Sequence, residues 1–284
     1  MIATTAYLIV YSIALLTLVS LGLAVIFGMM KVINLAHGEF MMLGAYACVV
    51  CVNAGAPLWL AFAGAALAVG LFGVIVERTI IRFLYGRIVD TLLATWGLSL
   101  FLVGFVTTVF GPQARSVPVS FGNVTFGGTS FSAYSFVLIG IAAAMVVATW
   151  AIARFTTAGL IVRGTMQDAG IAGALGVNPG LVYMGTFGYG AALAGLAGAT
   201  LVPITGASPS LGLFFVAKAF INVIVGGHLP LTGTLAASGL FGAIDGAVSY
   251  FWSSVGGEVT VLVVSVVLLR LLPFGITGRM RRGI

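Results

Sequence analysis

Charged residues are scarce along this chain. Only 6% of its 284 residues are Asp, Glu, Lys or Arg, whereas 61% are hydrophobic, and the mean hydropathy is +1.22. Soluble domains usually carry about 25% charged residues, so this composition excludes a soluble enzyme or regulatory domain of this size. The apolar character extends over the whole length and leaves no room for a separate aqueous domain. The sequence therefore predicts an integral membrane protein with one transmembrane domain over residues 1–284.

The chain also lacks the motifs of common catalytic sites. Cys48 and Cys51 are its only cysteines, and both lie in an apolar run, which argues against a disulfide framework. There is no phosphate-binding G-x-x-x-x-G-K-[ST] loop, no H-E-x-x-H zinc motif and no G-x-S-x-G elbow. We therefore expect no metal, no cofactor and no ATP hydrolysis by this chain. An intramembrane enzyme that uses His37 or His228 is a further interpretation, but no catalytic motif supports it.

Apolar runs of spanning length dominate what is present. A helix that crosses a bilayer needs about 20 apolar residues. The runs cover 5–27, 38–52, 57–76, 91–110, 132–153, 181–203, 211–226, 231–252 and 258–272. Two of them, 38–52 and 211–226, are short for a full crossing. The pattern predicts an all-α polytopic bundle of about 8–10 transmembrane helices, some of them short or interrupted.

The basic residues indicate the orientation of the bundle. They gather at the ends of apolar runs, which is typical of membrane topology and not of nucleic-acid binding. One set of loops holds Arg78, Arg82, Arg87, Arg154, Arg163, Arg270, Arg279, Arg281 and Arg282, and the other set holds Arg115. The positive-inside rule then predicts an external N-terminus and a cytoplasmic C-terminus. Segment 111–131 becomes an external loop, either a plain connection or a short hairpin, because Val117, Val119 and Phe121 alternate with other residues.

The cytoplasmic loop over 156–180 contains a second kind of pattern. Thr165 and Asp168 have the spacing of a capping box, Gly176 is a helix stop, and Pro179 prevents continuation. The pattern predicts one helix over 165–176, too short to cross the bilayer. Ile171 and Leu175 give it an apolar face. This helix either docks on a partner protein or merely joins two spans, and periodicity alone does not decide between them.

Polar residues interrupt the bundle near its N-terminal end. The stretch 34–40 reads "NLAHGEF", and Lys31 precedes it. Charged residues at membrane depth are costly unless paired and often mark a transport path. Backbone freed by a helix break must be buried in protein or face water. We therefore expect a discontinuous segment at which Asn34, His37, Gly38 and Glu39 shape a pathway, although helix capping is the alternative role for His37 and Glu39.

A similar interruption occurs in the second half. The short run 211–226 carries Lys218 and Asn222, and it is followed by "GGHLPLTG" (226–233). Two interrupted segments in corresponding halves indicate a midplane pathway built on internal repeats. Asp245 lies inside another apolar run and needs a partner that the sequence does not identify.

Three stretches taken together resemble the permease subunits of branched-chain amino acid ABC importers. They are "GMMKVINLAHGEFMMLGAYA" (28–47), "MQDAGIAGALGVN" (166–178) and "GYGAALAGLAGATLVPITGASPSLGLFFVAKAFINVIVGG" (188–227). The sequence departs from the family pattern at Ala169 and Gly170 and after Gly227.

The resemblance implies a non-catalytic membrane subunit of the bacterial inner membrane. Its partners would be two cytoplasmic ATPase subunits, a second permease of the same or another sequence, and an external solute-binding protein. The ATPase would contact Gln167, Asp168, Ala172, Leu175, Gly176 and Asn178. Asn34, His37, Gly38 and Glu39 would lie near the translocation path, to which the second interruption adds Lys218 and Asn222.

The resemblance leaves the substrate open. Members of this family carry branched-chain or hydrophobic amino acids, and relatives carry urea or short amides. A path with few fixed charges suits such solutes better than ions. The alternative of another class is a secondary transporter or channel driven by an ion gradient, in which Glu39, Lys218 and Asp245 would be linked to protons.

Overall fold

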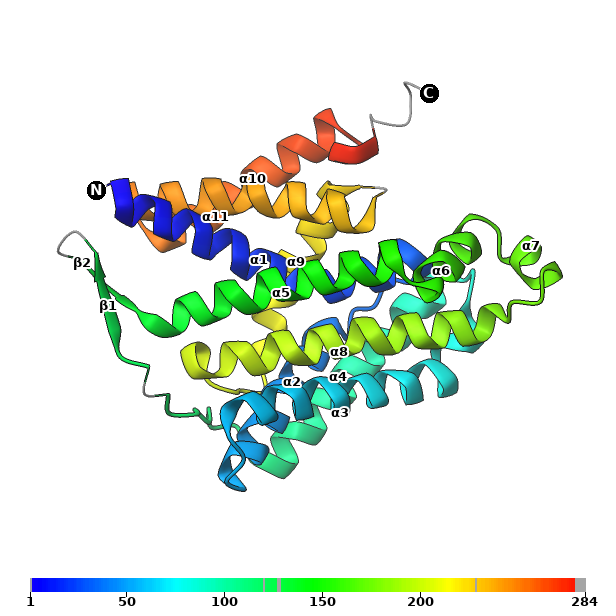
Figure 1. Cartoon of the computed structure of the whole chain (residues 1–284), viewed down its shortest axis with the longest axis horizontal. Helices are drawn as coiled ribbons and strands as arrows, with labels where there is room; N and C mark the ends of the chain where they lie inside the picture. Colours follow the sequence, from blue (N-terminus) through cyan, green and yellow to red (C-terminus); the bar gives the residue numbers. More distant parts are fainter. Residues whose placement is uncertain (1, 120, 127–128, 228, 279–284) are drawn as a thin grey trace. The chain divides into compact units, whose positions relative to one another are not determined.

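Helices dominate the computed structural model, which describes residues 2–119, 121–126, 129–227 and 229–278 (Figure 1). Within these residues seven helices are long and apolar enough to cross a membrane. They are α1 (Ile2–Met30), α3 (Leu58–Thr79), α4 (Ile88–Phe110), α5 (Ala133–Phe155), α8 (Pro179–Thr205), α10 (Pro230–Phe251) and α11 (Ser254–Leu271). The prediction of an all-α polytopic membrane protein is confirmed.

Two further apolar helices are shorter. They are α2 (His37–Asn53) and α9 (Leu211–Gly226), and both occupy runs that the sequence marks as short. The remaining helical elements are η1 (Ile81–Leu84), α6 (Thr157–Gln167) and α7 (Ala169–Ala174). Every apolar run therefore becomes a helix, because a backbone in a lipid environment must satisfy its hydrogen bonds within the segment.

A small hairpin interrupts the helices before α5. Strands β1 (Asn123–Phe126) and β2 (Thr129–Ser132) are antiparallel, with Val124 opposite Phe131. Of the two alternatives for segment 111–131, the structure has the hairpin. The strands begin after the alternating residues Val117, Val119 and Phe121, so that alternation did not locate them. Arg115 instead exchanges main-chain hydrogen bonds with Ala207 (2.9 and 2.7 Å).

The prediction of one helix over 165–176 is wrong. Thr165 is not an N-cap: it lies inside α6, and its hydroxyl donates to Ile161 O (2.9 Å). Asp168 separates α6 from α7, because its carboxylate accepts from Gly170 N (2.8 Å) and Ile171 N (2.9 Å) and so caps a new helix. The predicted stop at Gly176 is confirmed: its φ is +87°, and Val177 N donates to Ala172 O (3.0 Å).

The chain divides into two compact units that interleave along the sequence. The first unit contains Met1–Ser20, Val119–Val146 and Lys218–Ile284, and the second contains Leu21–Pro118 and Val147–Ala217. In the first unit, Leu16, Val225, Ala237 and Phe241 form a buried cluster. That the whole chain acts as one permease domain stays a prediction.

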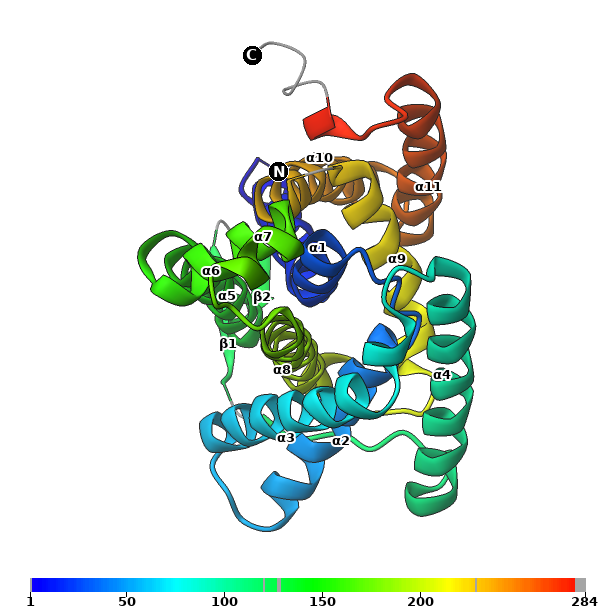
Figure 2. The same ribbon diagram turned by 90° about the vertical axis from the view of Figure 1, so that its right-hand side faces the viewer.

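The core of the second unit is built on close helix contacts at glycines. α8 packs extensively on α2 and α3 (Figure 2). Gly195 touches Gly44 of α2 and Val69 of α3, and Gly198 touches the main chain of Met41. Any side chain at these glycines would overlap its neighbour. Small residues let helices approach when no hydrophobic force pulls them together in lipid, and the stretch 191–200, "AALAGLAGAT", supplies them.

Candidate functional site

The first candidate site is the interruption between α1 and α2, in the second unit. α1 ends at Met30, and Lys31 has a φ of +53°, a left-handed conformation that is uncommon for a residue other than glycine. Residues 31–36 are not helical. The Asn34 side chain accepts from Ala36 N (3.1 Å), and His37 N donates to Asn34 O (3.2 Å), which starts α2. The sequence-predicted break is confirmed at this place.

The polar residues of the break are buried and close together. Asn34 and His37 are 0% exposed, and Glu39 is 1% exposed. Gly38 packs against Gly212 at the start of α9, so closely that neither position has room for a side chain. Lys31, by contrast, is exposed. The structure thus brings together Asn34, His37, Gly38 and Glu39 in a tightly packed site.

Hydroxyl groups of α4 satisfy the freed backbone of the break. Thr95 Oγ1 accepts from Leu35 N (3.1 Å) and lies 3.2 Å from Ile33 O. Ser99 lies one helical turn further along α4. Thr91, Thr95 and Ser99 are all buried. The sequence interpretation missed them, although hydroxyl residues spaced by four in an apolar helix were a visible signal.

Two polar atoms of the break still have no hydrogen-bond partner within the described part of the chain. They are Asn34 Nδ2, a donor, and Glu39 Oε2, an acceptor, and both are buried. A buried polar group without a partner costs about 1–3 kcal/mol. Buried polar groups in native structures usually have a hydrogen-bond partner, so these two atoms make the break a candidate site.

Lys218 and Asn222 belong to different environments in the first unit. Lys218 Nζ forms an ion pair with Glu258 Oε1 of α11 (2.6 Å), and both side chains are partly exposed. Asn222 is buried, and its Nδ2 donates to Ser20 Oγ (2.9 Å) and Ser238 Oγ (2.7 Å). The sequence interpretation missed these partners. Glu258 lies 40 residues from Lys218, and Ser238 and Ser20 lie 16 and 202 residues from Asn222.

Two other residues singled out in the sequence have different outcomes. The Asp245 carboxylate of α10 lies against Gly257 of α11, where no side chain would fit. His228 lies outside the described residues, as do Arg279, Arg281 and Arg282 of the C-terminus.

The second candidate site is the loop formed by α6 and α7. It is tied to the end of α5, because Arg163 donates to Ala153 O and Gly159 packs on the same turn. Ala172 of α7 is buried, whereas Ile171 and Leu175 are 62% and 80% exposed. Gln167, Asp168, Gly176 and Asn178 are exposed as well. Ile171 of α7 and Leu175 directly after it are two large exposed apolar side chains, which makes this loop a candidate contact surface.

The family comparison covers almost the whole chain, including both sites. Residues 5–272 match the model of the branched-chain amino acid transport system / permease component. The chain belongs to this permease family. The membership extends through the break, the α6–α7 loop and the short helix α9.

Curated relatives of this permease align over most of their own length and carry related names. The high-affinity branched-chain amino acid transport system permease protein LivH of Salmonella typhimurium is 28% identical over 279 residues, covering 92% of this chain and 91% of that one. BraD of Pseudomonas aeruginosa, a permease protein of the same description, is 30% identical over 285 residues with the same coverage. A probable LivH of Methanocaldococcus jannaschii is 25% identical and covers 95% and 90%.

A solved structure shares the fold of the permease. PsaBC from Streptococcus pneumoniae, determined in complex with Fab, aligns with a TM-score of 0.53 and covers 92% of this chain and 90% of that chain. The sequences are 14% identical, so the likeness concerns the fold alone. The family match and the seven apolar helices of the described residues together identify a multi-pass membrane permease.

The role of Thr95 in the permease can be tested directly. Thr95→Val keeps the shape of the side chain but removes the acceptor for Leu35 N. We expect a loss of about 1 kcal/mol or more in the free energy of unfolding, because a buried donor loses its partner. Thermal unfolding of the detergent-purified protein measures it. Thr108→Val is the control, since the Thr108 hydroxyl is exposed and bonds within its own helix to Gly104 O. Equal melting temperatures for both variants would contradict this role.

Proposed function

We propose that this chain is the membrane subunit of an ATP-driven importer and that it forms the path for branched-chain amino acids. The observation that carries the proposal is the family match over residues 5–272, together with the names of the curated relatives. The partners in this proposal are ATP-hydrolysing subunits on the cytoplasmic side, a second permease subunit and an external solute-binding protein. The chain itself contributes no covalent chemistry.

In this proposal the α6–α7 loop is the contact surface for the ATPase. The exposed side chains of Ile171 and Leu175 would insert into the partner, and Asp168 and Gly176 fix the two ends of α7. Gln167, Ala172 and Asn178 complete the surface. Exposing apolar side chains to water is unfavourable, so covering them with a partner stabilises the complex.

Movement of α7 has a direct mechanical route into the membrane. Val177 and Asn178 are all that separate the α7 stop from α8, and Asn178 caps α8 by accepting from Gly180 N (3.0 Å). α8 packs tightly on α2 and α3, so a displacement of α8 also moves the break before α2. Alternating access would follow from this coupling, since packed helices shift as rigid bodies.

The path would include the break residues Asn34, His37, Gly38 and Glu39. Their burial would correspond to a closed arrangement. Asn34 Nδ2 and Glu39 Oε2 have no hydrogen-bond partner among the described residues, and an amino acid would engage these polar groups when the segment opens. Asn222 and Lys218 would contribute from the second interrupted region. The Lys218–Glu258 ion pair offsets the cost of charge at this depth.

The loop arginines support an orientation. The ends of α3, α5 and α11 and the α6–α7 loop carry Arg78, Arg154, Arg270 and Arg163. By the positive-inside rule these ends face the cytoplasm, so the N-terminus would be external and the C-terminus internal. The location would be the bacterial inner membrane.

The experiment that tests the proposal is reconstitution of the transporter. The tagged chain would be purified from its native membrane with its associated subunits and placed in liposomes with ATP inside. We expect uptake of radiolabelled leucine, isoleucine and valine that requires both ATP and the binding protein. Unlabelled urea and acetamide should not compete.

Two results would redirect the proposal. Competition by urea or acetamide without uptake of leucine would make the substrate a short amide within the same importer class. Uptake that persists without any ATPase subunit and depends on a proton or sodium gradient would show a secondary transporter.

A further inference from the structure

A polar cavity opens beside the first turn of α8, in the second unit. Its volume is about 380 Å³, and its lining comes from Glu77, Arg78, Arg82, Tyr85, Asn178, Gly180 and Leu181. Small-molecule sites typically measure about 300–1,000 Å³, so the space fits a compact ligand or a lipid headgroup. Two guanidinium groups in one small cavity favour an anion.

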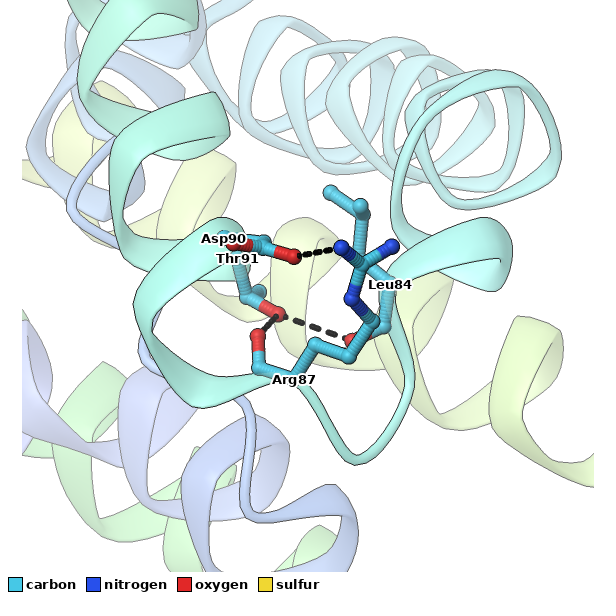
Figure 3. Close-up of polar contacts among 4 residues, drawn as sticks. All are labelled: Leu84, Arg87, Asp90 and Thr91. Carbon is cyan, nitrogen blue, oxygen red and sulfur yellow. Dashed lines mark hydrogen bonds and ion pairs between the residues drawn. The ribbon is translucent and has the colours of Figure 1, made fainter.

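Both arginines are available for a ligand. Arg78 lies in the last turn of α3, and Arg82 belongs to η1. Neither forms an ion pair with any residue of the described ranges. Arg82 only lies over the ring of Phe83, at 5.5 Å from its centroid. The neighbouring Arg87 differs, because its guanidinium pairs with Asp90 (2.5 Å) beside Thr91 and Leu84 (Figure 3).

The one acidic group in the lining is already engaged. Glu77 is 1% exposed, and the Tyr85 hydroxyl donates a hydrogen bond to its carboxylate. Burial, followed by this hydrogen bond to Glu77, raises the pKa of Tyr85, so the hydroxyl keeps its proton and the bond at physiological pH. With two arginines and one carboxylate, the lining carries a net charge of about +1. A ligand with a single negative charge would neutralise it.

The N-terminus of α8 contributes its dipole to the cavity, but its N–H groups at Gly180 and Leu181 already have acceptors. Gly180 N donates to the Asn178 side chain (3.0 Å), and Leu181 N donates to Asn178 O (3.1 Å). The arginines must therefore supply the hydrogen bonds to the anion. The positive end of the α8 dipole strengthens the attraction for an anion.

The position of the cavity indicates which anion reaches it. Arg78 is at the end of one candidate span, 58–79, and Gly180 is at the start of another, 179–205. The cavity therefore lies at the level of the lipid headgroups. Phe83 and Leu181 beside it are 68% and 55% exposed, which provides an apolar surface for acyl chains.

We propose that this cavity binds a phosphate ester through Arg78 and Arg82, as the headgroup of an anionic phospholipid. Basic pockets between spans on the cytoplasmic side bind anionic lipid headgroups in this way. The cavity adjoins the Asn178 cap, at the joint between the α6–α7 loop and α8. A lipid bound here would brace the start of α8. Free phosphate has the same binding chemistry, and the experiment separates the two sources.

Native mass spectrometry of the full-length permease in detergent tests the lipid source. The probes are phosphatidylglycerol and phosphatidylcholine with identical acyl chains. We expect preferential binding of phosphatidylglycerol, with a roughly fivefold loss for Arg78→Gln or Arg82→Gln. Arg87→Gln is the matched control, because it removes a charge from the same region but does not line the cavity. Arg78→Lys and Arg82→Lys keep the charge, and they replace the glutamine variants in this measurement if those do not fold.

A second arm tests free phosphate. Calorimetric titration of inorganic phosphate into the permease in phosphatidylcholine nanodiscs should show no binding if the ligand is a lipid. If inorganic phosphate binds and the Arg78 and Arg82 variants lose this binding, the anion site is confirmed but the lipid is ruled out as its ligand in favour of free phosphate. The site is refuted if neither probe depends on these arginines, or if Arg87→Gln weakens lipid binding as much as they do.

Discussion

Gly198→Ala should destabilise the membrane core more than any other single-methyl change on α8. A Cβ atom at this position overlaps the main-chain carbonyl of Met41, and a backbone cannot move aside as a flexible side chain can. Overpacking usually costs about 1–3 kcal/mol, and occasionally more. The loss should exceed the gain of nearly 1 kcal/mol that alanine brings over glycine in a helix. Thermal unfolding in detergent and the yield of monodisperse protein measure the effect.

The same helix provides the control. Gly185 lies on α8 with no atom within 4 Å of an added Cβ, so Gly185→Ala should leave the melting temperature unchanged or raise it. Gly44→Ala should resemble Gly198→Ala, because it forces α2 away from Gly195. If Gly198→Ala and Gly185→Ala unfold at the same temperature, the close contact of α2 with α8 does not exist in the protein.

The second large effect is expected on coupling to the ATPase. Asp168→Arg removes the cap of α7, which costs about 0.5–2 kcal/mol, and places a positive charge at the N-terminus of that helix. Gly176→Pro is incompatible with a φ of +87° and removes the bond from Gly176 N to Gly173 O. We expect each variant to reduce ATPase co-purification and ATP-dependent uptake roughly tenfold or more. A tenfold reduction corresponds to a loss of about 1.4 kcal/mol in binding free energy, which is within the range of losing the cap of α7.

Both coupling variants should leave the membrane core folded, because Asp168 and Gly176 are exposed and remote in sequence from the glycine contacts. Ser253→Ala is a suitable control, since it removes the N-cap of α11 by deleting the acceptor for Gly256 N (3.0 Å). It should lower stability without affecting ATPase binding. Normal co-purification and wild-type uptake in Asp168→Arg and Gly176→Pro would rule out the α6–α7 loop as the contact surface.

Local chemistry explains which parts of the fold were predictable. The limits of α9 and the stop at Gly176 follow from apolar length and from the conformation that glycine alone adopts easily. Asp168 shows where a local pattern has two solutions. The spacing from Thr165 fits a capping box, but the side chain of Asp168 instead caps the residues that follow it. Both arrangements satisfy backbone donors, and the sequence does not rank them.

The candidate site was predictable only in part. The break at "NLAHGEF" is visible because polar residues interrupt an apolar run. The spacing of hydroxyl residues on α4 is visible, but it does not show which of them contacts the break, because Thr95 and Thr108 look alike in sequence. Thr108 bonds within its own helix, whereas Thr95 reaches Leu35, 60 residues away. The partner of Lys218 was hidden for the same reason, since Glu258 lies 40 residues further along.

By itself the sequence determined that the chain is a helical membrane protein, where its apolar helices lie, and where the first of its polar interruptions falls. These properties depend on the composition and order of neighbouring residues, which lipid constrains through the backbone. Only the tertiary structure decided which glycines touch, which hydroxyl supports the break, and that Arg78, Arg82 and Tyr85 share one cavity with the start of α8. Such contacts depend on how distant helices pack, and no local pattern encodes their distance or direction.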